Sequence, residues 1–156
     1  NPKLYEVSAE VEKNELLEVE KVSHELDEII LEYRSVYGAG RAIAAPQIGY
    51  MKRLICMHID EPKVLINPVL FDKSEELFEL WDDCMSFPGF LVKVRRHKSC
   101  RIRFRDLQWN EHEWLLEDDM SELLQHEYDH LNGILATQRV VNGQGFAFLS
   151  ELRKVD

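Results

Sequence analysis

The chain has 156 residues, of which 45% are hydrophobic and 31% are charged. This composition excludes a disordered or fibrous chain, and the length predicts one domain spanning residues 1–156. The formal net charge of −10 argues against nucleic acid as a partner, and no apolar run approaches the roughly 18 residues of a membrane span.

The first predicted element is a long helix from Asn14 to Tyr37. Asn14 is expected to cap its start and Gly38 to end it. Apolar residues recur with a period near 3.6, which predicts one buried face. That face comprises Leu16, Val19, Val22, Leu26, Ile29, Ile30, Tyr33 and Val36.

Short β-rich runs separated by Pro and Gly follow, and they predict mostly antiparallel sheet. The predicted strands are residues 53–59, 64–71, 77–81, 90–94, 99–105 and 113–116, with a turn at 106–110. Arg101, Arg103 and Arg105 alternate with apolar residues, which indicates a solvated strand face rather than a phosphate-binding patch.

The three cysteines are too few, and odd in number, for a disulfide framework, so a reducing compartment is expected. Cys56 and Cys100 belong to apolar runs and are predicted to be core residues. Cys84 differs, because Asp82-Asp83 precede it and Pro88-Gly89 follow it, which predicts a polar turn.

A second helix is predicted from Asp119 to Asn132, capped by Asp118 or Asp119 and ended by Gly133. The tail at residues 140–156 is expected to end in a short docked helix.

This second helix contains His126, Glu127 and His130 in the pattern H-E-x-x-H. Residues four apart share one helix face, so both imidazoles can reach one metal while Glu127 lies beside them. The alternative, a structural histidine pair, is disfavoured by the helical placement and the adjacent glutamate.

A third ligand must come from upstream, because no histidine and few acids follow His130. Cys84 fits best, as a thiolate in a polar loop, with His97, His112 or an acid as alternatives. This arrangement argues against an endopeptidase, whose third ligand usually follows the helix.

Three motifs occur in order. They read Gly-Arg-Ala-Ile-Ala-Ala-Pro-Gln at residues 40–47, Asp-Asp-Cys-Met-Ser at 82–86 and Gln-His-Glu-Tyr-Asp-His at 125–130. On these the chain resembles the peptide deformylase family, with the third motif complete and the first two partial. The resemblance implies an α+β fold of mostly antiparallel sheets around a central metal-binding helix.

The resemblance also implies Cys84, His126 and His130 as ligands of one divalent metal per chain. Ferrous iron is the expected working ion, and zinc, nickel or cobalt also suit these ligands. Asp129 is expected either to support a ligating histidine or to lie on the surface.

The same resemblance assigns the catalytic groups. Metal-activated water attacks the formyl carbon, and Glu127 acts as base and then acid. The side-chain amide of Gln47 and the backbone N–H of Met85 stabilise the oxyanion.

The resemblance also implies which residues contact the substrate, and at some of these positions the chain departs from the family pattern. Gly40, Arg41, Ala42, Ile43 and Asp83 are the expected contact residues. Ala42 and Asp83 replace glycines, and Leu91 stands where relatives carry an arginine; Arg95 or Arg96 can replace that arginine or serve a structural role.

The implied function is removal of the N-formyl group from the N-terminal methionine of new polypeptides, with release of formate. N-formylated nascent chains, near the ribosome, are the expected partners of a monomer in the cytoplasm, or in a mitochondrial or plastid matrix. The alternatives are an amidase for another small N-acyl compound and a weakly catalytic metal-binding paralogue that binds a partner.

Overall fold

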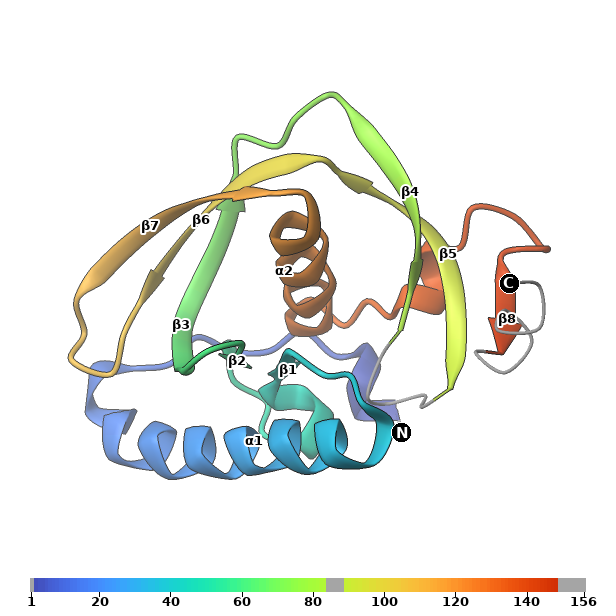
Figure 1. The fold of residues 1–156 in the computed structure, drawn as a ribbon. Helices are drawn as coiled ribbons and strands as arrows, with labels where there is room; N and C mark the ends of the chain where they lie inside the picture. The colour runs from blue at the N-terminus through green and yellow to red at the C-terminus, as the bar shows by residue number, and fades with distance from the viewer. Residues whose placement is uncertain (1, 84–88, 149–156) are drawn as a thin grey trace.

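The protein is described by a computed structural model over residues 2–83 and 89–148, and the predicted α+β class is confirmed (Figure 1). The helices are α1 (Leu16–Tyr37) and α2 (Asp118–Leu131). The strands are β1 (Ala42–Ala44), β2 (Leu54–His58), β3 (Pro62–Phe71), β4 (Leu77–Asp82), β5 (Phe90–His97), β6 (Ser99–Arg105), β7 (Glu111–Glu117) and β8 (Phe146–Phe148). Short 3₁₀ helices are η1 (Pro2–Tyr5), η2 (Lys13–Glu15), η3 (Ala45–Ile48) and η4 (Ala136–Arg139).

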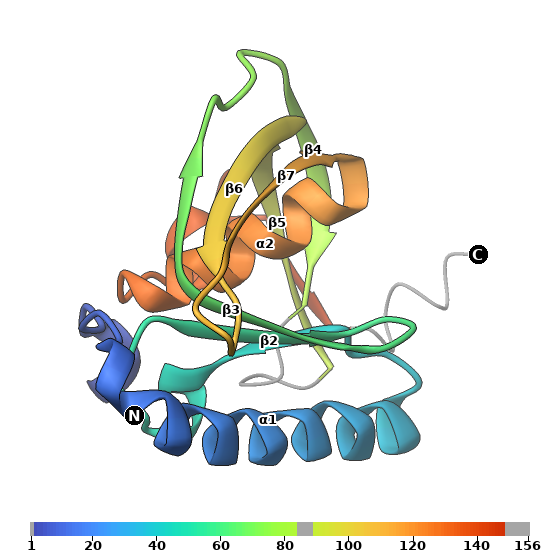
Figure 2. The same ribbon diagram turned by 90° about the vertical axis from the view of Figure 1, so that its left-hand side faces the viewer.

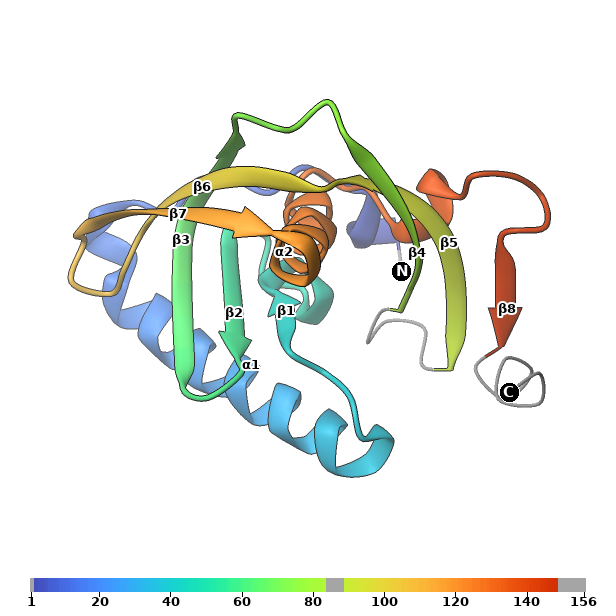
Figure 3. The same cartoon turned by 45° about the horizontal axis from the view of Figure 1, so that its top comes forward.

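The described strands form two antiparallel sheets. One has the order β1-β2-β3-β6-β7 and the other the order β4-β5-β8. Helix α2 lies between the two sheets, and α1 runs along the outer side of the larger one (Figures 2 and 3). The helix predicted to bind a metal is therefore the central element.

Strand β2 is covered on both faces, which explains its uninterrupted apolar sequence. Leu54 and Cys56 belong to the core cluster that contains the buried residues of α1. Ile55 and Met57 point the other way, into the cluster that contains Leu124 of α2. The alternation of side chains along one strand thus joins the two halves of the core.

Helix α1 has the predicted buried face and the predicted end, but not the predicted start. Val19, Leu26 and Ile30 are buried, and Gly38 ends the helix in the left-handed conformation with φ 70°. Asn14 as cap is wrong, because a 3₁₀ turn leads into the helix and Glu15 is the residue before its first turn. No helix among the described residues has both the length and the apolar character needed to cross a membrane.

The arginines of β6 face outward as predicted. Arg101 and Arg103 each approach a carboxylate oxygen of Glu113, at 3.7 and 3.6 Å, in exposed ion pairs. Cys100 and Ile102, on the other face of the strand, are fully buried. The predicted core positions of Cys56 and Cys100 are likewise confirmed.

Two short strands were not predicted. Residues 42–44 form β1, which pairs with β2, although their Ala-rich sequence has little β character. Residues 146–148 form β8 against β5, so this part of the tail is a strand. The end of the tail, where a short docked helix was predicted, falls at residues 149–156, which lie outside the described residues.

The predicted cap at the start of α2 is wrong, and the predicted glycine at its end is confirmed. Glu117 precedes the first turn, and Asp118 and Asp119 lie inside the helix instead of capping it. Gly133 adopts φ 72°, and a Cβ at this position would lie 2.4 Å from the backbone oxygen of Tyr5. Glycine is required there both by the backbone conformation and by the close approach of the N-terminal segment.

Candidate metal centre and active site

The two histidines of α2 meet inside the molecule. His126 and His130 are 4% and 1% exposed, and their Nε2 atoms lie 3.2 Å apart. Their i and i+4 positions place both rings on the face of α2 that is turned toward the smaller sheet. The predicted convergence of the two imidazoles is present.

Asp82, at the end of β4, holds one of these rings. Its Oδ2 lies 2.8 Å from His126 Nδ1. A carboxylate can only accept, so Nδ1 carries the proton and Nε2 is left with a lone pair toward His130. This is the orientation that a metal-ligating histidine requires.

Asp82 is in turn held by the buried guanidinium of Arg96. Arg96 donates to Asp82 Oδ2 at 2.9 Å and to Asp129 Oδ2 at 2.6 Å. Burial alone would raise the pKa of Asp82, but His126 and Arg96 hold it well below its usual range. Asp129 also accepts from Arg139, and it is buried, so the alternative of a surface acid is wrong.

The two adjacent arginines of β5 differ in burial. Arg96 is the structural arginine, with a side chain 3% exposed, whereas the Arg95 side chain is 61% exposed and pairs with Glu79. Burial would lower the pKa of Arg96, but the two aspartates raise it above its ordinary value. Arg96 therefore stays charged beside Asp82.

Glu127 is a buried acid next to the histidines. It is 4% exposed, and its Oε2 has no hydrogen-bond partner among the described residues. Burial raises the pKa of Glu127 to about 7; His126 opposes the shift, whereas Asp82 and Asp83 reinforce it. A carboxyl group with a pKa near neutrality can both accept and return a proton.

Gln47 reaches the same region through β1. The Ala44 N–H donates to Gln47 Oε1 at 2.9 Å, and the Ala44 backbone also lowers the pKa of Glu127. The side chains of Gln47 and Glu127 thus both interact with the backbone of Ala44 in β1.

The described residues fit a divalent metal between the histidines. Tetrahedral coordination with metal–nitrogen distances of about 2.0–2.1 Å separates two nitrogen ligands by roughly 3.3 Å, close to the observed 3.2 Å. Burial and then His126 lower the pKa of His130 to about 3, so its imidazole is neutral, as a ligand must be.

The predicted third ligand and one predicted oxyanion donor, Cys84 and Met85, lie outside the described residues. Within the described part of the chain, no group of three His, Cys, Asp or Glu side chains could hold a metal. His97 Nδ1 bonds to the Ser74 oxygen and His112 Nε2 to Asp106, so both alternative histidines are engaged elsewhere.

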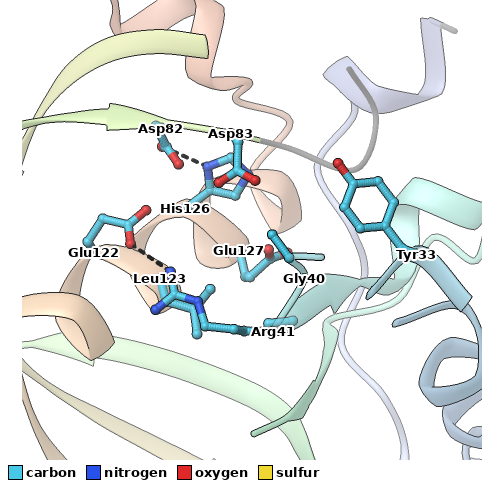
Figure 4. A pocket seen from close by; sticks show the side chains of 11 residues that line it. Tyr33, Gly40, Arg41, Asp82, Asp83, Glu122, Leu123, His126 and Glu127 are labelled. Carbon is cyan, nitrogen blue, oxygen red and sulfur yellow. Dashed lines mark hydrogen bonds and ion pairs between the residues drawn. The ribbon is translucent and has the colours of Figure 1, made fainter. Parts of the chain in front are cut away.

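A cavity of about 160 Å³ adjoins His126 and Glu127 (Figure 4). Arg41 and Glu122 form an ion pair on its wall, with 3.3 Å between Nη2 and Oε2. Burial and then Asp82 raise the pKa of Glu122 to about 8, while Arg41 opposes the shift. Arg41 and several acidic residues therefore line a space directly beside the predicted catalytic residues.

Four of the predicted substrate-contact residues line this cavity and one does not. The four are Gly40, Arg41, Ala42 and Asp83. Ile43 is 2% exposed and packs in the α1 cluster, so its side chain points away from the site. Gly40 has φ 132° and its carbonyl accepts from Arg34, which fixes the backbone just before β1.

The sequence did not reveal the roles of Asp82 and Glu122, and it left open which of Arg95 and Arg96 is the structural arginine. Asp82 contacts His126, 44 positions away in the sequence, and Arg96 contacts Asp129, 33 positions away. No local sequence pattern indicates such pairings. The position of Glu122 near the site could have been recognised from the sequence, because Glu122 lies four residues before His126 and so shares its helix face.

Comparison with known proteins finds the same family over most of the chain. The profile of the family described as polypeptide deformylase matches residues 1–145. The peptide deformylase of Prochlorococcus marinus subsp. pastoris is 31% identical over 147 residues, which cover 89% of this chain and 73% of that relative.

Solved structures are similar in fold. The peptide deformylase of Thermotoga maritima superposes with a TM-score of 0.82 at 28% identity, covering 91% of this chain and 93% of that chain. A Met-Ala-Ser-bound class I type b peptide deformylase from Acinetobacter baumannii gives 0.81 at 27% identity, covering 90% and 93%.

Proposed function

This chain belongs to the polypeptide deformylase family, and we propose that it removes the N-formyl group from the N-terminal methionine of newly made polypeptides by metal-dependent hydrolysis. Family membership makes it an enzyme, a hydrolase of protein biosynthesis with deformylase activity. The proposal adds the substrate, the metal and the residues that act.

One observation carries the proposal. His126 and His130 present two Nε2 atoms 3.2 Å apart beside the buried carboxyl of Glu127. A structural histidine pair would need no buried acid without a partner among the described residues. A hydrolytic site needs one, to move the proton of the attacking water.

His126, His130 and Cys84 would hold the metal, with Asp82 fixing the tautomer of the first histidine. Ferrous iron is the proposed working ion, and zinc, nickel and cobalt suit the same ligands. When bound, such an ion supplies Lewis acidity that lowers the pKa of water and polarises a carbonyl oxygen.

The proton steps belong to Glu127. With a pKa raised to about 7, it can take the proton of the attacking water and deliver it to the amine that leaves. The charge that develops on the formyl oxygen would be stabilised by the Gln47 side-chain amide and the Met85 N–H. The Gln47 carbonyl oxygen already accepts from Ala44, which orients that amide group.

The substrate would be a linear N-formylated peptide such as a nascent chain. In support, the Acinetobacter baumannii relative binds Met-Ala-Ser, the peptide that deformylation of formyl-Met-Ala-Ser leaves. The segment from Gly40 to Ala42 lines the cavity and offers an edge along which an extended peptide can lie.

The test is formate release from formyl-Met-Ala-Ser by protein loaded anaerobically with ferrous iron. The Glu127→Gln variant keeps the shape of the side chain and loses the base. We expect release that falls by about 10²-fold or more in the variant, with equal metal content in both proteins. Equal rates in both proteins would remove Glu127 from the mechanism.

A further inference from the structure

A second cavity, of about 160 Å³, lies on another face of α2 and shares no described lining residue with the cavity beside Glu127. We propose that it binds a phosphate anion, either inorganic phosphate or the phosphate group of a small metabolite. The proposal is independent of the proposed function, because it involves neither deformylation nor the metal.

The tertiary fold brings the lining of this cavity together from four parts of the chain. Lys73 follows β3, Arg96 belongs to β5, Asp129 to α2 and Arg139 to η4. Immediately after η4, Val140 forms an isolated antiparallel bridge with Val94 of β5, which holds η4 beside that strand (Figure 1). An anion at this place would therefore bridge segments that are distant in sequence.

The charge of the lining is opposite to that of the first cavity. The described residues that line it include one acid, Asp129, and four cations, Lys73, Arg95, Arg96 and Arg139. Arg95 also pairs with Glu79, which lies outside the lining. The first cavity has the reverse composition, four acids and one arginine, as expected for a chain with a net charge of −10. A local excess of positive charge attracts anions.

The single acid of the lining is shared between two guanidinium groups. Arg96 donates to Asp129 Oδ2 at 2.6 Å, and Arg139 donates to both carboxylate oxygens through Nε and Nη2. Arg139 thus retains the hydrogens of Nη1, and its side chain is 42% exposed. One negative charge does not neutralise two arginines, so an anion would meet net positive charge here.

Two further donors of the lining are unused. Lys73 forms no hydrogen bond or ion pair with any described residue. Arg96 is 3% exposed, and its Nε has no hydrogen-bond partner in the described part of the chain. A buried donor without a partner is costly, and an oxyanion that accepts from it would remove this cost.

The charge of Lys73 acts on the inner side of the larger sheet. Burial raises the pKa of the Cys100 thiol, and the Ser121 hydroxyl and the Lys73 charge oppose the shift. Cys100 faces α2, where its sulfur lies 3.5 Å from Ser121 Oγ. Lys73 therefore adds its charge to the same space as the arginines. A phosphate group suits this set of donors, because its oxygens can accept several charge-assisted hydrogen bonds at once.

The test is isothermal titration calorimetry of the metal-loaded protein with inorganic phosphate, adenosine monophosphate and adenosine, at constant ionic strength. We expect saturable binding of the two phosphate compounds and no binding of adenosine. Tighter binding of inorganic phosphate would identify the free ion as the ligand, and tighter binding of the monophosphate would identify a metabolite. Absence of binding by both phosphate compounds would overturn the proposal.

Three variants locate the binding site. Lys73→Gln removes one exposed charge and should fold normally, and we expect it to weaken phosphate binding about tenfold. Adding Arg139→Gln to this variant should abolish measurable binding. Lys98→Gln is the matched control, because Lys98 pairs with Glu76 on the surface outside the lining, and it should bind as the parent does.

Phosphate held by the metal or by the general surface would bind equally to the parent and to all three variants. Equal affinities would therefore overturn the proposal, even though phosphate binds. The single Lys73 variant gives this answer on its own if the double variant does not fold.

Discussion

His126 Nδ1 lies 2.8 Å from Asp82 Oδ2, so a carboxylate 44 positions earlier in the chain fixes the ring of a proposed metal ligand. The contact joins the end of β4 to the middle of α2. The proposed metal centre therefore depends on the packing of the smaller sheet against the central helix.

Replacing Asp82 by Asn should weaken metal binding. The variant keeps the shape of the side chain but loses the charge that makes His126 a stronger donor, and we expect affinity to fall about 10- to 100-fold. The metal affinity of each protein can be measured by competition with a chelator for zinc. Glu79→Gln in the same strand, with a side chain 40% exposed, is the control and should bind normally. Equal affinity in the Asp82 variant would show that the carboxylate does not tune the ligand.

Arg96 should matter far more to stability than its neighbour Arg95. Arg96→Met leaves the buried carboxylates of Asp82 and Asp129 without their shared cation, which should lower the free energy of unfolding by about 3 kcal/mol. Arg95→Met removes an exposed pair with Glu79 and should cost less than about 1 kcal/mol. Urea unfolding distinguishes the two, and similar losses would contradict the assignment of Arg96 as the structural arginine.

Gly133→Ala should destabilise the end of α2. The added Cβ would need φ 72° and would lie 2.4 Å from the Tyr5 oxygen, so we expect a loss of about 2 kcal/mol or more. Gly143→Ala is the matched control, because nothing lies within 4 Å of a Cβ there. Thermal unfolding of both variants should show a lower Tm for the first alone.

A pH effect is expected away from the metal centre, at Asp106. Hydrogen bonding from His112 is the main cause that lowers the pKa of Asp106, helped by the backbone of Asn110 and Gln108. A carboxyl whose folded pKa lies below its unfolded value stabilises the fold above the unfolded pKa. That stabilisation is lost as the pH falls through the folded pKa.

Asp106→Asn keeps an oxygen for the two backbone donors and removes the charge. The variant should be less stable than the parent by less than about 1 kcal/mol near pH 6, because solvent reaches both side chains of the pair, which are 43% and 25% exposed. The difference should shrink as the pH falls below the unfolded pKa, which is about 3.9 for Asp. Unfolding by urea over this range measures it, and a difference that grows on acidification would refute the assignment.

The sequence predicted an element best where the residue pattern that indicates it lies entirely within that element. Strand β6 was predicted with its observed bounds, since its alternation of charged and apolar residues is complete within seven positions. The patterns that predicted helix α2 and its two histidines likewise lie within one segment of the chain. In contrast, β1 is three residues of Ala and Ile that become a strand only through pairing with β2.

The remainder of the site was not predictable because it is made by contacts between distant elements. Asp82 read as part of a turn, and only the fold brings it to His126 and Arg96. Glu122 was assigned no role from the sequence, and only the fold places it, 6% exposed, beside Arg41. Both predicted N-caps failed, since a 3₁₀ turn leads directly into α1 and the extended end of β7 leads directly into α2, with no side-chain cap bond at either start.

Strand β2 has a consequence for how the molecule opens. Its alternate side chains lie in two different core clusters, one with α1 and one with α2. Neither helix can detach without exposing one face of this strand, so α1 and α2 belong to one cooperative unit. Amide hydrogens in the middle of β2 should therefore exchange with solvent only through unfolding of the whole chain.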